Sequence, residues 1–151
     1  MDGASRVIAD GIAYRIGRGD PDGERNNCLI DSIRQCLGLQ VNCRKVRSDL
    51  QCMYAAAQGR RKVTETSYLD ITEHWEAIVE SLFKHNTAGA HTRRISISDY
   101  CVIALYSNRV GNADNGVVAG NVKARYRLVV LNNADVHFDP CLPLENAESH
   151  K

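Results

Sequence analysis

The chain has 151 residues, of which 44% are hydrophobic and 25% charged, and its formal net charge is +1. This length suits one domain with a real hydrophobic core, so we expect a single domain over residues 1–151. The balanced charge gives no electrostatic reason to expect nucleic acid or an anionic membrane as a partner. No apolar run approaches the roughly 18 residues of a spanning helix, and the N-terminus lacks an apolar signal-peptide segment.

The cysteines are even in number, which admits a disulfide framework: Cys28, Cys36, Cys43, Cys52, Cys101 and Cys141. Three of them (Cys36, Cys52 and Cys101) sit within apolar patterns typical of buried thiols, and a chain this long needs no covalent staples. We therefore expect free thiols in a reducing intracellular compartment. The sequence has no C-x-x-C pair, and its histidines stand alone without H-E-x-x-H spacing, so we expect no metal site.

The first part of the chain predicts a short hairpin, a loop and a helix. Residues 6–16 alternate as a strand or hairpin does, and the glycine-punctuated stretch 17–23 predicts a loop. A helix then begins at or just before Cys28, where Asn26 or Asn27 can cap its start, and it can end at Gly38. Its apolar stripe consists of Leu29, Ile33, Cys36 and Leu37.

Two further helices are predicted in the middle of the chain. The first spans about 48–58, because Ser48 with Gln51 fits a capping box and Gly59 can terminate it. The second spans about 71–84, where Asp70 and Glu73 supply the cap and box. It has the strongest helical period in the chain, formed by Trp75, Ile78, Val79 and Leu82.

The final third predicts mainly strands. Residues 86–94 resemble a loop, 98–106 fit either a helix capped by Ser98 or a buried strand, and we favour the helix there. A turn over 112–116 precedes a central strand over 122–131, and a short strand over 136–139 leads into Pro140. We therefore expect an α+β protein, with a helical part followed by a small, mostly antiparallel sheet.

Cys28 has the setting of a nucleophile. A thiol at a helix start meets unpaired backbone N–H groups and the positive end of the helix dipole, so we expect its pKa to lie below the free value of about 8.5. The N–H of Cys28 and those of the preceding loop can bind the oxyanion of a tetrahedral intermediate.

His137 and Asp139 complete a candidate triad. The two side chains lie on one face of the predicted strand because strand side chains alternate. His137 can accept the thiol proton and return it to the leaving group, and Asp139 can fix the tautomer and orientation of the ring. We interpret His74 as solvent-facing, His85 and His91 as flanking a loop, and His150 as part of the tail.

These two segments resemble the ovarian-tumour (OTU) family of cysteine proteases, most of which are deubiquitinases. Asn27-Cys28-Leu29-Ile30-Asp31-Ser32-Ile33 is similar to the family's nucleophile helix, and His137-Phe138-Asp139-Pro140 to its histidine strand. The apolar residues 128–131 resemble the strand that precedes the family's histidine. The resemblance implies a papain-like OTU-type fold with no cofactor, a monomer that removes ubiquitin or a ubiquitin-like protein, and Cys28, His137 and Asp139 as its triad.

The chain departs from the family pattern ahead of the nucleophile. The family carries an aspartate three residues before the cysteine, where this chain has Arg25. The oxyanion loop would consist of Arg25, Asn26 and Asn27, and we expect the two asparagines to hold it and the loop to order on binding substrate. Small divergent members occur among bacterial effectors, toxins and viral proteins, and an effector would act in the host cytoplasm.

Two other functions are compatible with the same residues. A papain-like effector that deamidates glutamine, or another acyl-transfer enzyme, uses a similar triad on a different bond. A non-catalytic interaction domain would simply bury Cys28. A deubiquitinase needs a groove for an extended tail that ends in two glycines, and the loops 17–25 and 111–121 are suited to line it.

Overall fold

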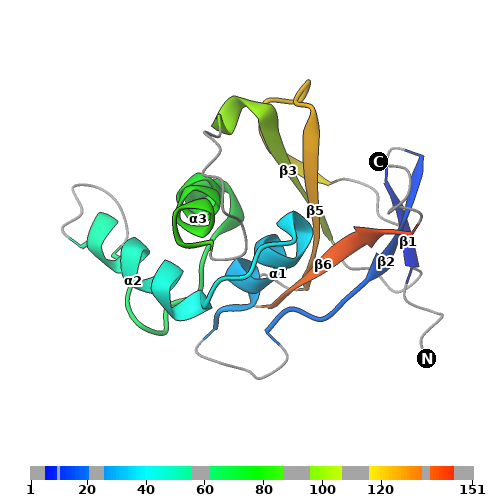
Figure 1. The fold of residues 1–151 in the computed structure, drawn as a ribbon. Helices are drawn as coiled ribbons and strands as arrows, with labels where there is room; N and C mark the ends of the chain where they lie inside the picture. Colours follow the sequence, from blue (N-terminus) through cyan, green and yellow to red (C-terminus); the bar gives the residue numbers. More distant parts are fainter. Residues whose placement is uncertain are drawn as a thin grey trace.

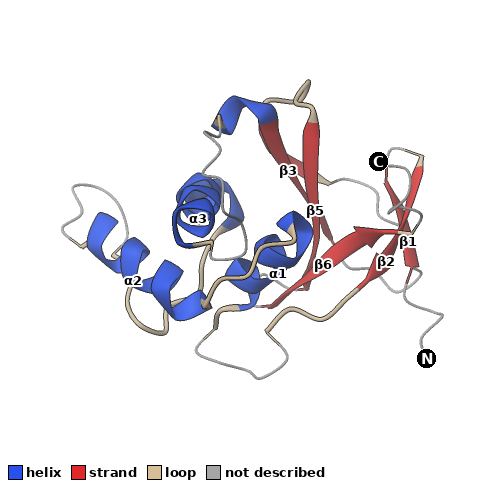
Figure 2. Ribbon diagram, in the orientation of Figure 1, coloured by secondary structure: helices blue, strands red, loops and turns tan. Residues whose placement is uncertain are grey.

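The computed structural model describes residues 6–9, 11–20, 26–55, 62–86, 96–106, 116–133 and 137–144. Three helices lie on one side of a six-stranded sheet (Figures 1 and 2). The helices are α1 (Cys28–Leu37), α2 (Cys43–Met53) and α3 (Ile71–His85). The strands are β1 (Arg6–Ala9), β2 (Ile12–Ile16), β3 (Tyr100–Tyr106), β4 (Val117–Gly120), β5 (Tyr126–Asn133) and β6 (His137–Pro143).

The sheet has the strand order β1-β2-β6-β5-β3-β4. Only β3 and β5 run parallel, and the other four pairings are antiparallel. Strand β2 pairs with β6 solely from Cys141 to Pro143. The first half of β6, residues 137–140, is therefore not paired with β2. Its backbone edge opposite β5 faces other parts of the chain, and α1 contacts this strand.

Several elements match the sequence prediction. The predicted hairpin over 6–16 forms β1 and β2. Helix α1 begins at Cys28 and ends at Gly38, whose φ of 69° lies in the left-handed region that glycine adopts without strain. Helix α3 begins after Asp70, whose side chain accepts the N–H of Glu73 at 2.9 Å, as the predicted cap requires. The α+β prediction is confirmed.

Several elements differ from the prediction. The strand expected over 122–131 is β5 at Tyr126–Asn133, and β4 at Val117–Gly120 was not predicted. Helix α2 begins at Cys43 rather than near 48, because the side chain of Asn42 caps it by accepting the N–H of Arg44 at 2.8 Å. The helix favoured over 98–106 is wrong. A single 3₁₀ turn over Ile97–Asp99 leads into strand β3, where burial on both faces suits the β-branched residues Val102 and Ile103.

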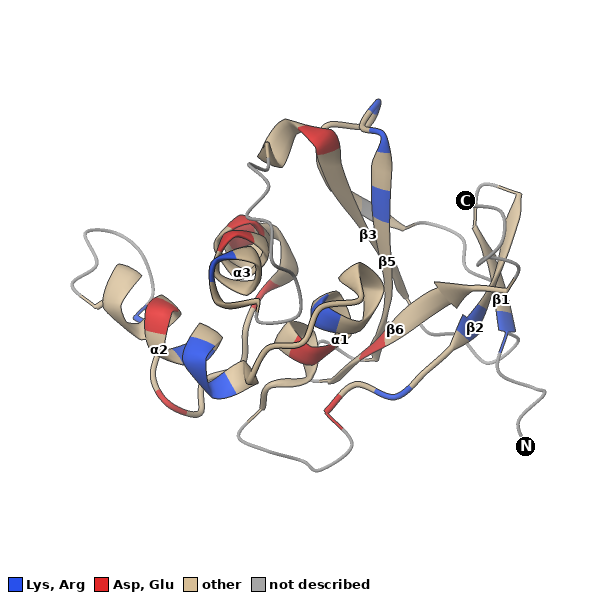
Figure 3. Cartoon of the chain, viewed as in Figure 1, with Lys and Arg blue, Asp and Glu red and all other residues tan. Residues whose placement is uncertain are grey.

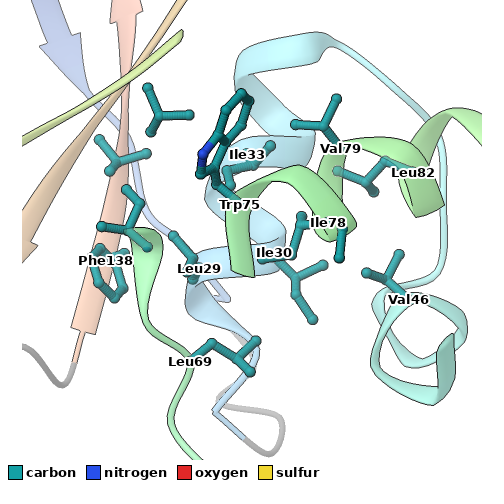
Figure 4. Close-up of a cluster of buried hydrophobic side chains, with 14 of the residues drawn as sticks. Leu29, Ile30, Ile33, Val46, Leu69, Trp75, Ile78, Val79, Leu82 and Phe138 are labelled. Carbon is teal, nitrogen blue, oxygen red and sulfur yellow. The ribbon is translucent and has the colours of Figure 1, made fainter. Parts of the chain in front are cut away.

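A hydrophobic core fills the space between the helices and the sheet (Figure 4). Ile30 and Ile33 of α1 pack there with Trp75 and Ile78 of α3. Phe138 of β6 enters the same core and is 4% exposed. Because side chains alternate along a strand, burying Phe138 places His137 and Asp139 together on the other face of β6.

Helices α2 and α3 each carry charged residues of both signs. Figure 3 shows both basic and acidic residues on α2 and on α3. Among the residues that the structure describes, no helix is both long and apolar enough to cross a bilayer.

Candidate active site

Cys28 is the first residue of α1, and its sulfur contacts strand β6. The backbone N–H of Phe138 donates to Sγ of Cys28 over a nitrogen–sulfur distance of 3.3 Å. The thiol thus lies beside the residue that directly follows His137. Cys28 is buried, with 6% of its surface exposed.

Burial shifts the pKa of Cys28 in the direction opposite to the one expected from its position at a helix start. Desolvation is the largest effect and raises the pKa of the thiol above 9.0, and the carboxylate of Asp20 raises it further. The N–H groups of Phe138, Cys28 and Leu29 oppose this by stabilising the thiolate, as expected at a helix start. They do not offset the loss of hydration, so the net effect of this environment is to favour the neutral thiol.

His137 and Asp139 form a hydrogen-bonded pair on strand β6. Nε2 of His137 lies 2.8 Å from Oδ1 of Asp139. An ionised carboxylate accepts hydrogen bonds and donates none, so in this pair the neutral ring carries its hydrogen on Nε2 and Nδ1 is the unprotonated nitrogen. The backbone N–H of Gly19 also donates to Oδ1 of Asp139, at 2.9 Å. Asp139 is therefore held in place by a second donor.

The segment after β2 closes over the start of α1 and β6. The N–H of Gly17 donates to the carbonyl of Pro140 at 2.8 Å. The hydroxyl of Ser32, one turn along α1 from Cys28, donates to the carbonyl of Phe138 at 3.0 Å. Both bonds use the part of β6 that β2 leaves unpaired, and the Ser32 bond fixes α1 against β6.

Gly19 has no room for a side chain. A Cβ at this position would collide with the carbonyl oxygen of Phe138 and lie within 2.5 Å of the Ser32 hydroxyl. Both groups belong to the buried joint between α1 and β6, so neither can move away cheaply. The glycine lets the chain approach closely enough to bind Asp139.

Asp31 anchors the other end of this segment. Its carboxylate accepts the N–H of Asp20 at 2.8 Å and a side-chain bond from Gln35 at 2.9 Å, and it pairs with Arg34 at 2.9 Å. Asp20 has a φ of 52°, a left-handed conformation that aspartate tolerates better than most residues. The resulting turn brings the Asp20 carboxylate near enough to Cys28 to affect its pKa.

The loop before Cys28 is held by a residue that sequence analysis missed. Arg25 lies outside the described residues. Asn26 and Asn27 are described, and Arg47 of α2 donates to both: from Nη2 to the carbonyl of Asn26 at 2.9 Å and from Nε to Oδ1 of Asn27 at 3.0 Å. The side chain of Asn26 donates to the carbonyl of Thr66. Asn27 occupies the N-cap position of α1, but its side chain binds Arg47 instead of capping the helix.

The sequence could have identified Arg47 as a buried residue, but only if the start of α2 had been predicted correctly. With the helix beginning at Cys43, Arg47 falls on the stripe that also buries Val46 and Leu50. A charged residue on the buried face of a helix needs dedicated partners, which marks it as a candidate for a structural or functional network. The predicted helix over 48–58 left Arg47 outside.

Two hollows adjoin Asn27. The larger, of about 630 Å³, is lined by the segment after β2, including Arg18 and Asp20, and by Asp31 of α1. The smaller, of about 270 Å³, lies on the side of α2 and is lined by Arg47 and Glu65. Of the first loop expected to line a groove, Gly17, Arg18 and Asp20 line the larger hollow, and residues 21–25 lie outside the described part. Residues 111–115 lie outside the described part, and 117–120 form β4, separated from β6 by two strands.

The remaining histidines and cysteines have other settings. His74 is 4% exposed, which corrects the expectation that it faces solvent, and His85 lies 3.0 Å from Asp49. His91 and His150 lie outside the described residues. Cys52 is exposed rather than buried, and none of the six cysteines is in a disulfide. Within the described ranges, no group of three His, Cys, Asp or Glu residues is arranged to hold a metal ion.

No family model matches this chain, and no curated protein matches it in sequence. Two solved structures match it in fold. One is the crystal structure of an OTU deubiquitinase from Wolbachia pipientis wMel bound to ubiquitin, with a TM-score of 0.53 and 14% identity over 86% of this chain and 96% of that one. The other is a crystal structure of an OTU deubiquitinase from the same organism, with a TM-score of 0.52 and 14% identity over 91% and 93% of the two chains. The protein therefore has the papain-like α+β fold of the OTU deubiquitinases, as a divergent example of it.

Proposed function

We propose that the protein is a cysteine-dependent isopeptidase that removes ubiquitin or a ubiquitin-like protein, with Cys28, His137 and Asp139 as its triad. The observation that carries the proposal is the joint between α1 and β6. There Sγ of Cys28 accepts the N–H of Phe138, and the preceding His137 binds Asp139. The ubiquitin complex of the structural neighbour supports ubiquitin as the partner.

In the first half of the reaction, Nδ1 of His137 takes the proton from the thiol as sulfur attacks the carbonyl carbon of the isopeptide bond. Because burial raises the pKa of Cys28, a base that accepts the thiol proton assists the attack. The N–H of Cys28 and those of the loop before it bind the oxyanion. The intermediate then expels the lysine amine, which takes its proton from His137, and leaves a thioester on Cys28.

The second half of the reaction regenerates the thiol. His137 removes a proton from water as the water oxygen attacks the thioester carbonyl. The second intermediate expels the sulfur, which recovers its proton from the imidazolium, and the product leaves as a carboxylic acid that loses its remaining proton to water. Asp139 stays ionised throughout and stabilises the imidazolium while keeping the ring oriented.

The test is reaction with ubiquitin that bears an electrophile at its C-terminus, followed by measurement of intact mass. We expect one adduct on the wild-type protein and none on Cys28→Ala. Cys52→Ser is the matched control, because it removes an exposed thiol and should leave the adduct unchanged. Hydrolysis of an isopeptide-linked ubiquitin dimer then distinguishes a protease from a deamidase. An adduct that persists in Cys28→Ala, or none on the wild type, would overturn the proposal.

A further inference from the structure

Arg47 is a buried cation in the middle of α2, with 3% of its surface exposed. All three guanidinium nitrogens donate to neutral oxygens. Nε and Nη2 bind Asn27 and Asn26, and Nη1 binds the carbonyls of Thr64 at 3.2 Å and Ser67 at 2.8 Å. Burying a charge costs free energy, and desolvation lowers the pKa of this group. Packing alone does not explain a buried guanidinium at this position. The groups that Arg47 binds indicate its role.

The contact with the Asn26 carbonyl fixes the orientation of one peptide group. A trans peptide is planar, and its C=O and N–H point in opposite directions. Since Nη2 of Arg47 binds the carbonyl of Asn26, the N–H of Asn27 must point away from Arg47. Asn26 has a φ of 60°, so the chain turns sharply at this peptide. Rotation of the peptide by half a turn would break the bond to Arg47.

Asn27 is fixed on its other side as well. Its Oδ1 accepts Nε of Arg47, and its carbonyl accepts the N–H of Asp31 at 2.9 Å as the first bond of α1. Asn27 is 2% exposed. The backbone between the asparagines and the nucleophile is thus held from α2 and from α1 at once.

We infer that Arg47 is a positioning residue that orients the Asn26–Asn27 peptide, and through it the backbone donors that bind the oxyanion next to Cys28. The inference rests on the proposed acyl-transfer function. In a chain that has Arg25 where the OTU pattern has aspartate, Arg47 supplies the restraint on the loop from α2. It acts through Asn26 and Asn27 and does not touch the reacting atoms.

The same guanidinium joins the loop to a second segment. Arg47 binds the carbonyls of Thr64 and Ser67, and the side chain of Asn26 donates to the carbonyl of Thr66. The loop before the nucleophile and the segment 62–68 therefore share one anchor. A lysine cannot reproduce this anchor, because its ammonium lacks the planar fork that reaches several carbonyls.

The experiment compares Arg47→Lys with Arg44→Lys, the same substitution at an exposed position of the same helix. Loss of one oxyanion donor costs about 100- to 1000-fold in kcat, so we expect Arg47→Lys to lower kcat by about 100-fold while KM changes less than about threefold. Arg44→Lys should change neither. A loss confined to KM, or one accounted for by the unfolded fraction in a thermal melt, would overturn the inference.

Asn27→Ala provides the second variant, which leaves the buried cation in place. We expect it to lower kcat, and the double variant with Arg47→Lys to be no worse than the poorer single variant, because both act on one loop. Additive losses would show independent roles. The rate of acylation of Cys28 by p-nitrophenyl acetate, measured in a Cys52→Ser background, should fall in the same order. This readout needs no ubiquitin, so it tests Arg47 even if ubiquitin is not the substrate.

Discussion

Replacing Gly19 by alanine tests how the proposed triad is held together. The added methyl group would collide with the backbone carbonyl of Phe138 and with the hydroxyl of Ser32. Phe138 is fixed by its buried side chain, and Ser32 is 0% exposed. The segment 17–20 must therefore move away from β6. That movement breaks the bond from the N–H of Gly19 to Asp139.

Two hydrogen bonds determine the size of the effect. The bond from Gly19 to the Asp139 carboxylate is charge-assisted and contributes about 1.5–3 kcal/mol, and disturbing the bond from Ser32 to Phe138 costs about 1 kcal/mol more. We expect Gly19→Ala to lower the free energy of unfolding by about 2–4 kcal/mol. Asp139 also loses one of its two donors, so His137 is less well aligned. A displacement of about 1 Å can lower kcat by about 100-fold.

The assay combines urea unfolding with kcat and KM on a fluorogenic ubiquitin substrate. Gly38→Ala is the matched control, because it strains the left-handed end of α1 without meeting any atom within 4 Å. It should cost about 1 kcal/mol and leave kcat unchanged. If Gly19→Ala kept wild-type stability and kcat, the close approach between residues 17–20 and β6 would not support the site.

Three further predictions concern single side chains. His137→Ala should reduce kcat almost to the level of Cys28→Ala, because it removes the group that accepts the thiol proton. Asp139→Ala should keep measurable turnover, because the imidazole remains and is only less well oriented. Equal losses would contradict these roles. Iodoacetamide should label the exposed Cys52 first at neutral pH, and peptide mass mapping should find little modification of the thiols with a pKa of about 12, which are Cys36, Cys43 and Cys141. Burial lowers the pKa of His74 below 6.5, so the unfolded chain binds its proton first as pH falls. The wild type should therefore lose stability relative to His74→Asn below about pH 6.5, by at most about 1.4 kcal/mol per pH unit, and parallel urea curves for the two proteins would refute this.

The elements that sequence predicted well are those with local signals. Helix α3 has a cap at Asp70 and a regular apolar stripe, and α1 ends at a glycine that suits a left-handed turn. Strand β3 was mistaken for a helix because both of its faces are buried. Its apolar run then lacks the alternation that distinguishes a strand, and only pairing with β4 and β5 determines its conformation.

The contact of Cys28 with strand β6 and the pairing of His137 with Asp139 could be predicted, because each residue has a chemical identity and a local position. The groups that hold these residues could not, because they act across the fold. Arg47 reaches the loop at Asn26 and Asn27 from a neighbouring helix, and Gly19 binds Asp139 from 120 positions away. The pKa of Cys28 was mispredicted for the same reason. The helix start is a local feature, whereas burial against Phe138 depends on tertiary packing.

The charge of Asp20 offers a direct test of the electrostatics at Cys28. Its carboxylate raises the pKa of Cys28, while its backbone N–H holds the turn by donating to Asp31. Asp20→Asn removes the charge and keeps that N–H, and asparagine tolerates the same left-handed conformation. The thiolate should then form at lower pH, so the iodoacetamide rate of Cys28 in a Cys52→Ser background should reach its midpoint at lower pH than in the parent protein.

The control is Glu76→Gln, an equal change of charge at an exposed position on α3. It should leave the midpoint unchanged, since charges far apart across solvent are screened. A midpoint that rises or stays constant in Asp20→Asn would mean that this carboxylate does not act on the thiol. A midpoint below neutral pH in the parent protein would mean that the helix start and the N–H of Phe138 outweigh burial. The protein without substrate would then hold a thiolate already paired with the imidazolium of His137.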